Sequence, residues 1–249
     1  MESLQVSLNE LAHLCHLASL GKLLGGLIHN LNSPLHSLGM QMDVMQHFIL
    51  KKSEISNDVS EKLSARLTQM NNEFENLNNQ IRIAGMRADL MESSPEKLDI
   101  NHFLHQEMQF LKTNLYFKHN VETTLELSPS LQAITPPPPH ASLALGLFLE
   151  RLAEELERLK RNTLSLGTGT EEGHLIISVQ IDDAALSKPF RDILEMDLQN
   201  PPPIPEISGE MHLFISVLLL RNAGIQFEIE MNDRGTSIKL LFPRGNGMG

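Results

Sequence analysis

The residues best suited to chemistry stand in the stretch Leu20–Leu38, which reads LGKLLGGLIHNLNSPLHSL. His29 carries an imidazole, which can serve as a nucleophile, a base or a ligand near neutral pH. Five residues later, Pro34 offers no N–H to the carbonyl of Asn30, so we expect it to interrupt the helix and bend it just after His29. A proline inside a helix costs about 3 kcal/mol, which favours a functional role for this stretch.

The surrounding pattern places His29 on an outward face of a long helix. Apolar residues recur in steps of three and four from about residue 8 to 50, as in an a/d heptad seam. This seam consists of Leu14, Leu17, Gly21, Leu24, Ile28, Leu31, Leu35, Leu38, Met42, Met45 and Ile49. Ile28 takes an a position, so His29 takes a b position and is expected to face solvent. His36 lies one heptad further along the same face.

A second helix is expected over about 58–92, after a polar turn at 51–58. Its seam consists of Leu63, Leu67, Met70, Phe74, Leu77, Ile81, Ala84, Ala88 and Met91. Two such helices form an antiparallel hairpin that leaves much of its apolar stripe in water, whereas two hairpins bury that stripe as a four-helix bundle. We therefore predict a homodimer through residues 10–92.

Beyond Pro95 the pattern changes to mixed α and β. Helices are expected at about 100–115, 141–160 and 210–222, and a loop-like, proline-containing region at 184–208. Strands are expected at 121–127, 163–166, 174–181, 226–231 and 236–242. The last residues, 245–249, are predicted to be disordered.

Composition narrows the classes of partner. The formal net charge of −11 argues against broad affinity for nucleic acid or anionic lipid. The lone Cys15 cannot form an internal disulfide, and His13 and His16 do not share one helix face with it, so no metal site is expected. The longest apolar runs, Leu143–Leu149 and Leu213–Leu220, are far shorter than the ~20 residues a bilayer requires. We expect a cytoplasmic protein without membrane insertion.

The region around His29 resembles the H-box of sensor histidine kinases, which has the form His-Glu-x-x-Asn-Pro-Leu or Thr-Pro-Leu on the first helix of a dimerisation hairpin. The matching residues are His29, Pro34 and Leu35, together with the approach Leu17–Leu23, LASLGKL. The resemblance covers about residues 14–92.

The resemblance implies that His29 is a phosphoacceptor that exchanges a phosphoryl group with an aspartate of a response-regulator receiver domain. The family's acidic residue after the histidine, a base for autophosphorylation, is here Asn30, which cannot take a proton. The fourth residue after the histidine, which can position water for phosphatase activity, is here Ser33 and keeps a hydroxyl. These departures weaken the autokinase interpretation more than the phosphotransfer one.

The order of elements from 98 to 242 resembles the ATP-binding domain of the same superfamily, an α/β sandwich. The predicted fold class is therefore α+β: a hairpin forming a dimeric four-helix bundle, followed by this sandwich. The predicted domains are residues 1–94, the phosphoacceptor hairpin, and 95–244, a degenerate ATPase-like domain.

The nucleotide-binding boxes of that domain are mostly lost. The family's adenine-binding Asp-x-Gly-x-Gly corresponds to Asp182 and Asp183 without either glycine, and its glycine-rich phosphate box keeps Gly209 alone. We expect weak or absent ATP binding and no cofactor. ATP with Mg²⁺ would bind only if the site is divergent rather than dead.

The helix at 141–160 carries a Mg²⁺-binding Asn in the family but contains no Asn here. Glu150 or Glu154 could stand near that position, although we favour a solvated acidic face that also includes Glu155 and Glu157.

Three hypotheses follow for the function. The first is a dimeric two-component phosphotransfer protein with His29 as the phosphoacceptor. The second is an active ATP-dependent autokinase with a divergent nucleotide site, and the third is a non-catalytic scaffold that binds a kinase or a receiver.

Overall fold

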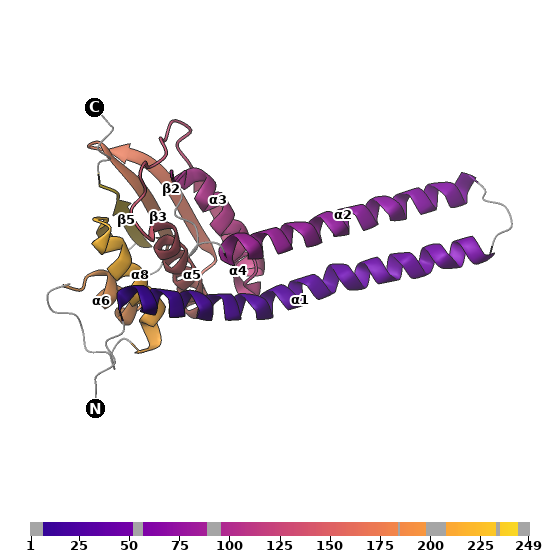
Figure 1. The fold of residues 1–249 in the computed structure, drawn as a ribbon, viewed down its shortest axis with the longest axis horizontal. Coiled ribbons are helices and arrows are strands. Elements are labelled where there is room, and N and C mark those ends of the chain that lie inside the picture. Colours follow the sequence, from indigo (N-terminus) through magenta and orange to yellow (C-terminus); the bar gives the residue numbers. More distant parts are fainter. Residues whose placement is uncertain are drawn as a thin grey trace. The chain divides into compact units, whose positions relative to one another are not determined.

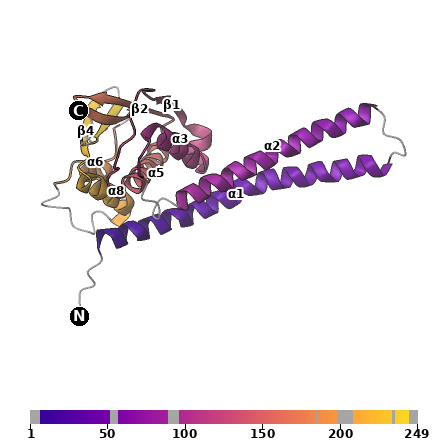
Figure 2. The same ribbon diagram turned by 45° about the horizontal axis from the view of Figure 1, so that its top comes forward.

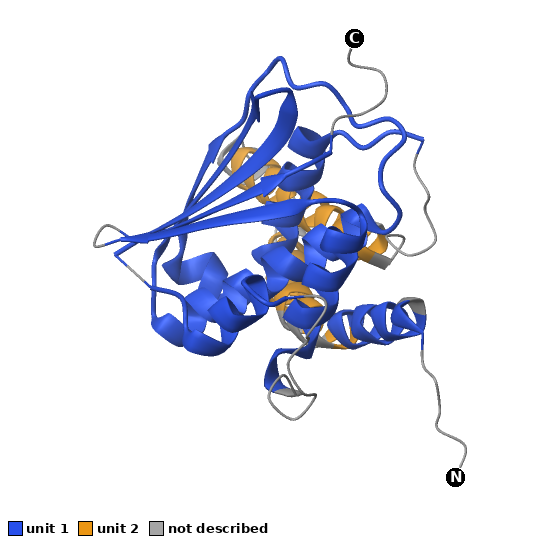
Figure 3. Cartoon of the chain, turned by 90° about the vertical axis from the view of Figure 1, so that its left-hand side faces the viewer, with its two compact units in different colours: residues 1–20, 89–249 blue, residues 21–88 orange. Residues whose placement is uncertain are grey.

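The computed structural model describes residues 7–51, 57–88, 96–183, 185–197, 208–232 and 235–243. The chain forms two compact units, shown in Figure 3: Gly21–Ala88, and Met1–Leu20 together with Asp89–Gly249. The first turns of the first helix thus belong to the same unit as the mixed α and β part. The predicted boundaries at 94/95 and 244/245 lie outside the described residues.

The two predicted helices of the hairpin are present. Helix α1 spans Leu8–Lys51 and helix α2 spans Asn57–Ala88, and Figures 1 and 2 show them running side by side. Their facing surfaces include polar contacts, since Arg66 donates to Gln41 and the Ser37 hydroxyl donates to Glu73 at 3.4 Å.

Pro34 does not interrupt α1, so the predicted break is wrong. The proline lies inside one continuous helix and is buried. Proline removes one backbone hydrogen bond and crowds one carbonyl. Helix formation is cooperative, and tertiary packing of one face stabilises a long helix, so the other turns of this 44-residue helix carry it through the defect.

The mixed α and β unit, residues 1–20 and 89–249 (blue in Figure 3), contains a five-stranded mixed sheet with helices packed on one face. Strands β1 and β2 are parallel, the other neighbours are antiparallel, and the order is β1-β2-β3-β5-β4. The helices are α3 (Ile100–Leu111), α4 (Leu115–Asn120), α5 (Ala141–Leu159), α6 (Lys188–Leu194), the 3₁₀ turn η1 (Ser208–Glu210) and α8 (Met211–Asn222). The strands are β1 (Glu122–Glu126), β2 (Thr163–Glu171), β3 (His174–Asp182), β4 (Gln226–Asn232) and β5 (Gly235–Leu241).

Alternation along the central strand β3 sends every second side chain into the core. On β3, Leu175, Ile177, Val179 and Ile181 are buried and the residues between them are partly exposed. Helix α5 packs beside α8, where the buried Ser216 hydroxyl donates to the Ala144 carbonyl at 2.8 Å. The predicted α+β fold class is thereby confirmed, while a four-helix bundle needs a second copy of the hairpin.

Two predicted segments differ from the structure. The single helix expected at 100–115 is two helices, because Asn114 caps α4 by accepting a hydrogen bond from the Phe117 N–H at 2.9 Å. The loop-like region at 184–208 contains α6, capped by Ser187 and with Pro189 in its first turn. Proline is well tolerated there, because the first N–H groups of a helix have no intrahelical partner.

Candidate functional site

The segment around position 29 is helical, but the side chain of His29 lies outside the described residues. Residues three, four and seven positions along a helix share its face. Asn32, Ser33 and His36, which stand in that relation to position 29, are all exposed. The face of α1 that passes through position 29 is therefore open to solvent at each of these residues.

The four residues singled out around the histidine do not share one face. Ser33 is exposed, whereas Pro34 is buried and Asn30 keeps only 9% of its surface. Because Asn30 is buried and Ser33 is exposed, the two side chains do not lie on the same open face of α1. Of Asn30, Ser33 and Pro34, Ser33 alone lies on the exposed face that passes through position 29.

A second face of the hairpin is apolar and exposed. On α1, Leu14, Ile28, Leu35 and Met42 fall on one heptad series, and Ile28 and Met42 each keep 59% of their surface. On α2, the series continues in Leu67, Phe74 and Ile81, which are also exposed. Other seam residues, such as Leu38 and Leu77, are buried within the hairpin. The seam residues thus divide into one set that is buried between α1 and α2 and a second set that stays exposed to solvent in the single chain.

The remnants of the nucleotide boxes lie at the surface of the mixed α and β unit. Asp182 ends β3 and is exposed, and Asp183 follows it in a left-handed conformation with φ of 52°. Gly209 is exposed within η1, with open space where a side chain would be. Glycine is therefore not required by packing at position 209.

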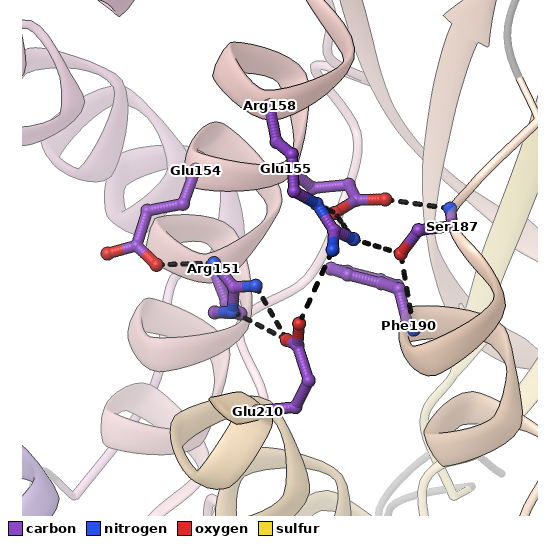
Figure 4. A network of polar contacts seen from close by, with 7 residues as sticks. All are labelled: Arg151, Glu154, Glu155, Arg158, Ser187, Phe190 and Glu210. Carbon is purple, nitrogen blue, oxygen red and sulfur yellow. Dashed lines mark hydrogen bonds and ion pairs between the residues drawn. The ribbon is translucent and has the colours of Figure 1, made fainter. Parts of the chain in front are cut away.

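Charged side chains of α5 bind the elements that follow β3 and precede α8, as Figure 4 shows. Glu155 has no exposed surface, and its carboxylate accepts a hydrogen bond from the Ser187 backbone N–H at 2.7 Å. Arg158 bonds the same carboxylate, with Nε at 2.9 Å, and also donates to the Ser187 hydroxyl. These bonds fix the start of α6 to α5.

Arg151 performs the same role for η1. Its guanidinium donates to the Glu210 carboxylate from Nε at 2.8 Å and from Nη2 at 2.6 Å, and it also bonds Glu154. Burial by itself lowers the pKa of Arg151, but the bonds to Glu210 and Glu154 outweigh burial and raise that pKa above its ordinary value. We call Arg151, Glu154, Glu155, Arg158, Ser187 and Glu210 the α5 network.

The prediction of a solvated acidic face on α5 is wrong for Glu155, which is fully buried. Glu150 is also engaged, since the Ser19 hydroxyl of α1 donates to its carboxylate. Ser19 lies with Ala12, Cys15 and His16 on a buried face of the first turns of α1. The acidic residues of α5 are thus largely bound by other parts of the chain.

Sequence reasoning missed Arg151, Arg158 and Glu210 as members of this cluster. The segment ERLAEELERLK alternates opposite charges three residues apart, which could have indicated ion pairs along the helix. Glu210, the partner from η1, had no local sequence signal, because it lies 59 residues away from Arg151.

Among the described residues, no group of three His, Cys, Asp or Glu side chains could hold a metal ion. The described helices also include none with the length and apolar composition of a membrane span.

Several solved structures are similar to this chain. A bacterial phosphotransferase aligns over 90% of this chain and 96% of its own, with 11% identity and a TM-score of 0.44. The histidine kinase AdeS of Acinetobacter baumannii aligns over 88% and 98%, with 10% identity and a TM-score of 0.44. The histidine kinase domain of the E. coli osmosensor EnvZ aligns over 63% and 93%, with 18% identity and a TM-score of 0.46. No protein family and no curated protein matches the sequence.

Proposed function

We propose that this chain is a dimeric, histidine-kinase-like phosphotransfer protein of two-component signalling. His29 is its phosphoacceptor, and a response-regulator receiver domain is its partner. The observation that carries the proposal is the pairing of the His29–Leu35 motif with an open helix face at Asn32, Ser33 and His36. A phosphoacceptor must be reached by an aspartate of another protein, and this face offers that access.

In the proposed reaction, a neutral ring nitrogen of His29 attacks the phosphorus of an aspartyl phosphate on the receiver. The new N–P bond forms as the O–P bond to the carboxyl oxygen breaks, so the receiver recovers its aspartate carboxylate. The imidazole carries the positive charge until its other nitrogen releases a proton to solvent. The reverse reaction returns the phosphoryl group to the receiver, and we assign to the Ser33 hydroxyl, four residues after His29, the role of holding a water molecule for phosphatase activity.

The second copy in the proposed dimer covers the exposed apolar stripe of α1 and α2. The stripe repeats every seven residues at Ile28, Leu35 and Met42 and at Leu67, Phe74 and Ile81. Large apolar side chains exposed at every heptad of both helices suggest an interaction surface. A second hairpin carries the same stripe and buries it as a four-helix bundle.

ATP-dependent autokinase activity is proposed to be weak or lost. The Glu150 carboxylate is bound by Ser19, and Arg151 and Glu210 are paired with each other. The carboxylate that could replace the family's Mg²⁺-binding Asn is thus already bonded within the chain, and helix α5 contains no Asn. The proposal therefore requires no bound cofactor, and the phosphoryl group comes from the receiver.

The experiment incubates the purified chain with receiver domains of its source organism, each phosphorylated in advance with ³²P-labelled acetyl phosphate and then desalted. Label is expected on the wild type and absent from His29→Ala. A separate incubation with Mg-[γ-³²P]ATP alone is expected to leave both proteins unlabelled. ATP-dependent labelling of His29 would instead favour the divergent autokinase. A chain that stays unlabelled after incubation with each phosphorylated receiver would favour the scaffold.

A further inference from the structure

Strand β4, labelled in Figure 2, is an edge strand of the sheet. In the described part of the sheet, β5 pairs with it on one side and no strand lies beyond it. None of its seven residues is buried, whereas Ile238 and Leu240 of the adjacent β5 are. The strand contains no proline or glycine. An edge strand of this kind presents backbone groups that another extended segment can bind.

The backbone groups of β4 that point away from the sheet belong to Phe227, Ile229 and Met231. The Phe242 N–H donates to the Leu175 carbonyl at 2.8 Å, and the register of β3 and β5 places these two residues opposite each other. Antiparallel pairs alternate along a strand, so the even-numbered residues of β5 bond β3 and the odd-numbered ones bond β4. Register then assigns the bonds to β5 to the even-numbered residues of β4. The three odd-numbered residues each offer one N–H and one carbonyl outward.

The same three residues form a half-covered apolar row on the side of the sheet that carries the helices. The Phe227 ring packs against Phe148 of α5, with 5.9 Å between the ring centroids. Ile229 and Met231 follow on the same face, because alternate residues of a strand share a face. All three stay partly exposed. An added strand would lie about 4.8 Å away, and its apolar side chains would cover this row.

The other face of β4 selects the charge of the partner. Glu228 and Glu230 are exposed on that face. Lys239 of β5 stands opposite Glu228, but its ammonium group bonds Glu171 at 3.0 Å. A second copy of β4 paired antiparallel about Ile229 would place glutamate opposite glutamate, which is unfavourable. A strand with Lys or Arg at the same positions would instead form cross-strand pairs of opposite charge.

We propose that β4 binds an extended segment of a partner protein, which joins the sheet as a sixth strand and alternates Lys or Arg with apolar residues. The basic residues face Glu228 and Glu230, and the apolar residues cover the row that begins at Phe227. Main-chain hydrogen bonds supply the affinity in this mode of recognition, and the alternating side chains supply the specificity. The inference goes beyond phosphotransfer, because it uses no residue of the His29 region.

The test measures the fluorescence anisotropy of a labelled peptide, Lys-Val-Lys-Ile-Lys-Val-Lys, titrated with the full chain at 50 mM salt. The wild type is expected to bind it. Ile229→Pro is expected to weaken binding about tenfold or more, because proline lacks the outward N–H and its ring occupies the edge.

The matched control is Thr123→Pro in β1, the other edge strand. The Glu122 N–H donates to the Asn162 carbonyl at 2.7 Å on the side of β2. Alternation along the strand then points the Thr123 N–H away from the sheet, as at Ile229. Thr123→Pro is therefore expected to bind the peptide as the wild type does.

A charge exchange tests the specificity of the edge. Glu228→Lys/Glu230→Lys is expected to weaken binding of the Lys peptide about tenfold and to make the chain prefer Glu-Val-Glu-Ile-Glu-Val-Glu. The control is Glu122→Lys/Glu126→Lys, which changes the net charge equally at exposed positions of β1. This control should keep the preference of the wild type for the Lys peptide.

Binding lost in Ile229→Pro and kept in Thr123→Pro supports the inference, as does the exchanged preference. Ile229→Pro keeps its hydrogen bonds to β5, and if it nevertheless fails to fold, the charge exchange decides. Equal binding by Ile229→Pro and the wild type overturns the inference, and so do equal effects of the two charge exchanges or a wild type that does not bind the Lys peptide. A lower oligomer mass of Ile229→Pro in light scattering would assign the edge to a second copy and also overturns it. His29→Ala is expected to bind the peptide normally, which separates this inference from the proposed function.

Discussion

Glu155 is a carboxylate without exposed surface, and both of its oxygens accept hydrogen bonds. One accepts from the Ser187 backbone N–H and the other from Arg158. We predict that Glu155→Ala lowers the free energy of unfolding by about 1–3 kcal/mol, because it leaves these donors without an acceptor. Glu157→Ala, an exposed position on the same helix, should change it by no more than about 0.5 kcal/mol. Urea unfolding measures both, and equal effects would contradict the role given to Glu155.

Cys15 reports on the first turns of α1. It is buried, and burial raises the pKa of its thiol above the ordinary value. A raised pKa leaves less thiolate at pH 8 than in an unfolded chain, so we predict slow alkylation by iodoacetamide in the native protein and fast alkylation in urea. Alkylation at the unfolded rate under native conditions would show that this face of α1 is open rather than packed.

Strand β5 begins with a close approach that only glycine allows. Gly235 has φ of +134°, and a side chain there would overlap the Ile181 carbonyl of β3. We predict that Gly235→Ala destabilises the fold by about 1–3 kcal/mol through strain and overpacking. The control is Gly169→Ala in β2, where a side chain would meet open space. Thermal unfolding of the two variants compares them, and equal melting temperatures would refute the strain at Gly235.

Hydrophobic periodicity predicted most elements, because period is a local property of the chain. The two long helices and the five strands lie close to their predicted positions. Period also identified the seam residues, but it could not separate Leu38, buried within the hairpin, from Leu35, exposed beside it. That division depends on which helix lies opposite, which is a tertiary property.

The failures at the element scale have specific causes. The continuity of α1 through Pro34 reflects cooperativity over many turns, which outweighs a local defect. Helix α6 lies where a loop is predicted from the prolines of residues 184–208. Pro189 does not prevent the helix, because it occupies a first-turn position where proline is compatible with a helix. Burial of Glu155 could not be predicted, because its partner Ser187 comes from a distant part of the chain.

At the scale of the whole molecule, the proposed four-helix bundle requires two copies of the hairpin. Ile28 and Leu35 are both exposed in one chain, on the stripe assigned to the dimer. We predict that Ile28→Glu/Leu35→Glu converts a wild-type dimer into a monomer, because the new carboxylates would have to be buried unpaired. Asn32→Glu, on the exposed polar face of the same helix, should leave the dimer intact. Light scattering after gel filtration measures the masses, and a monomeric wild type would exclude the four-helix bundle.

His29 is proposed to carry the phosphoryl group, and mass spectrometry of peptides at alkaline pH identifies the labelled residue. The chain is incubated with the phosphorylated receiver and digested under conditions that preserve phosphohistidine. We predict one phosphorylated site, at His29, after incubation with the receiver and none after incubation with Mg-ATP alone. Phosphate at another of the eleven histidines, or at none of them, would contradict it.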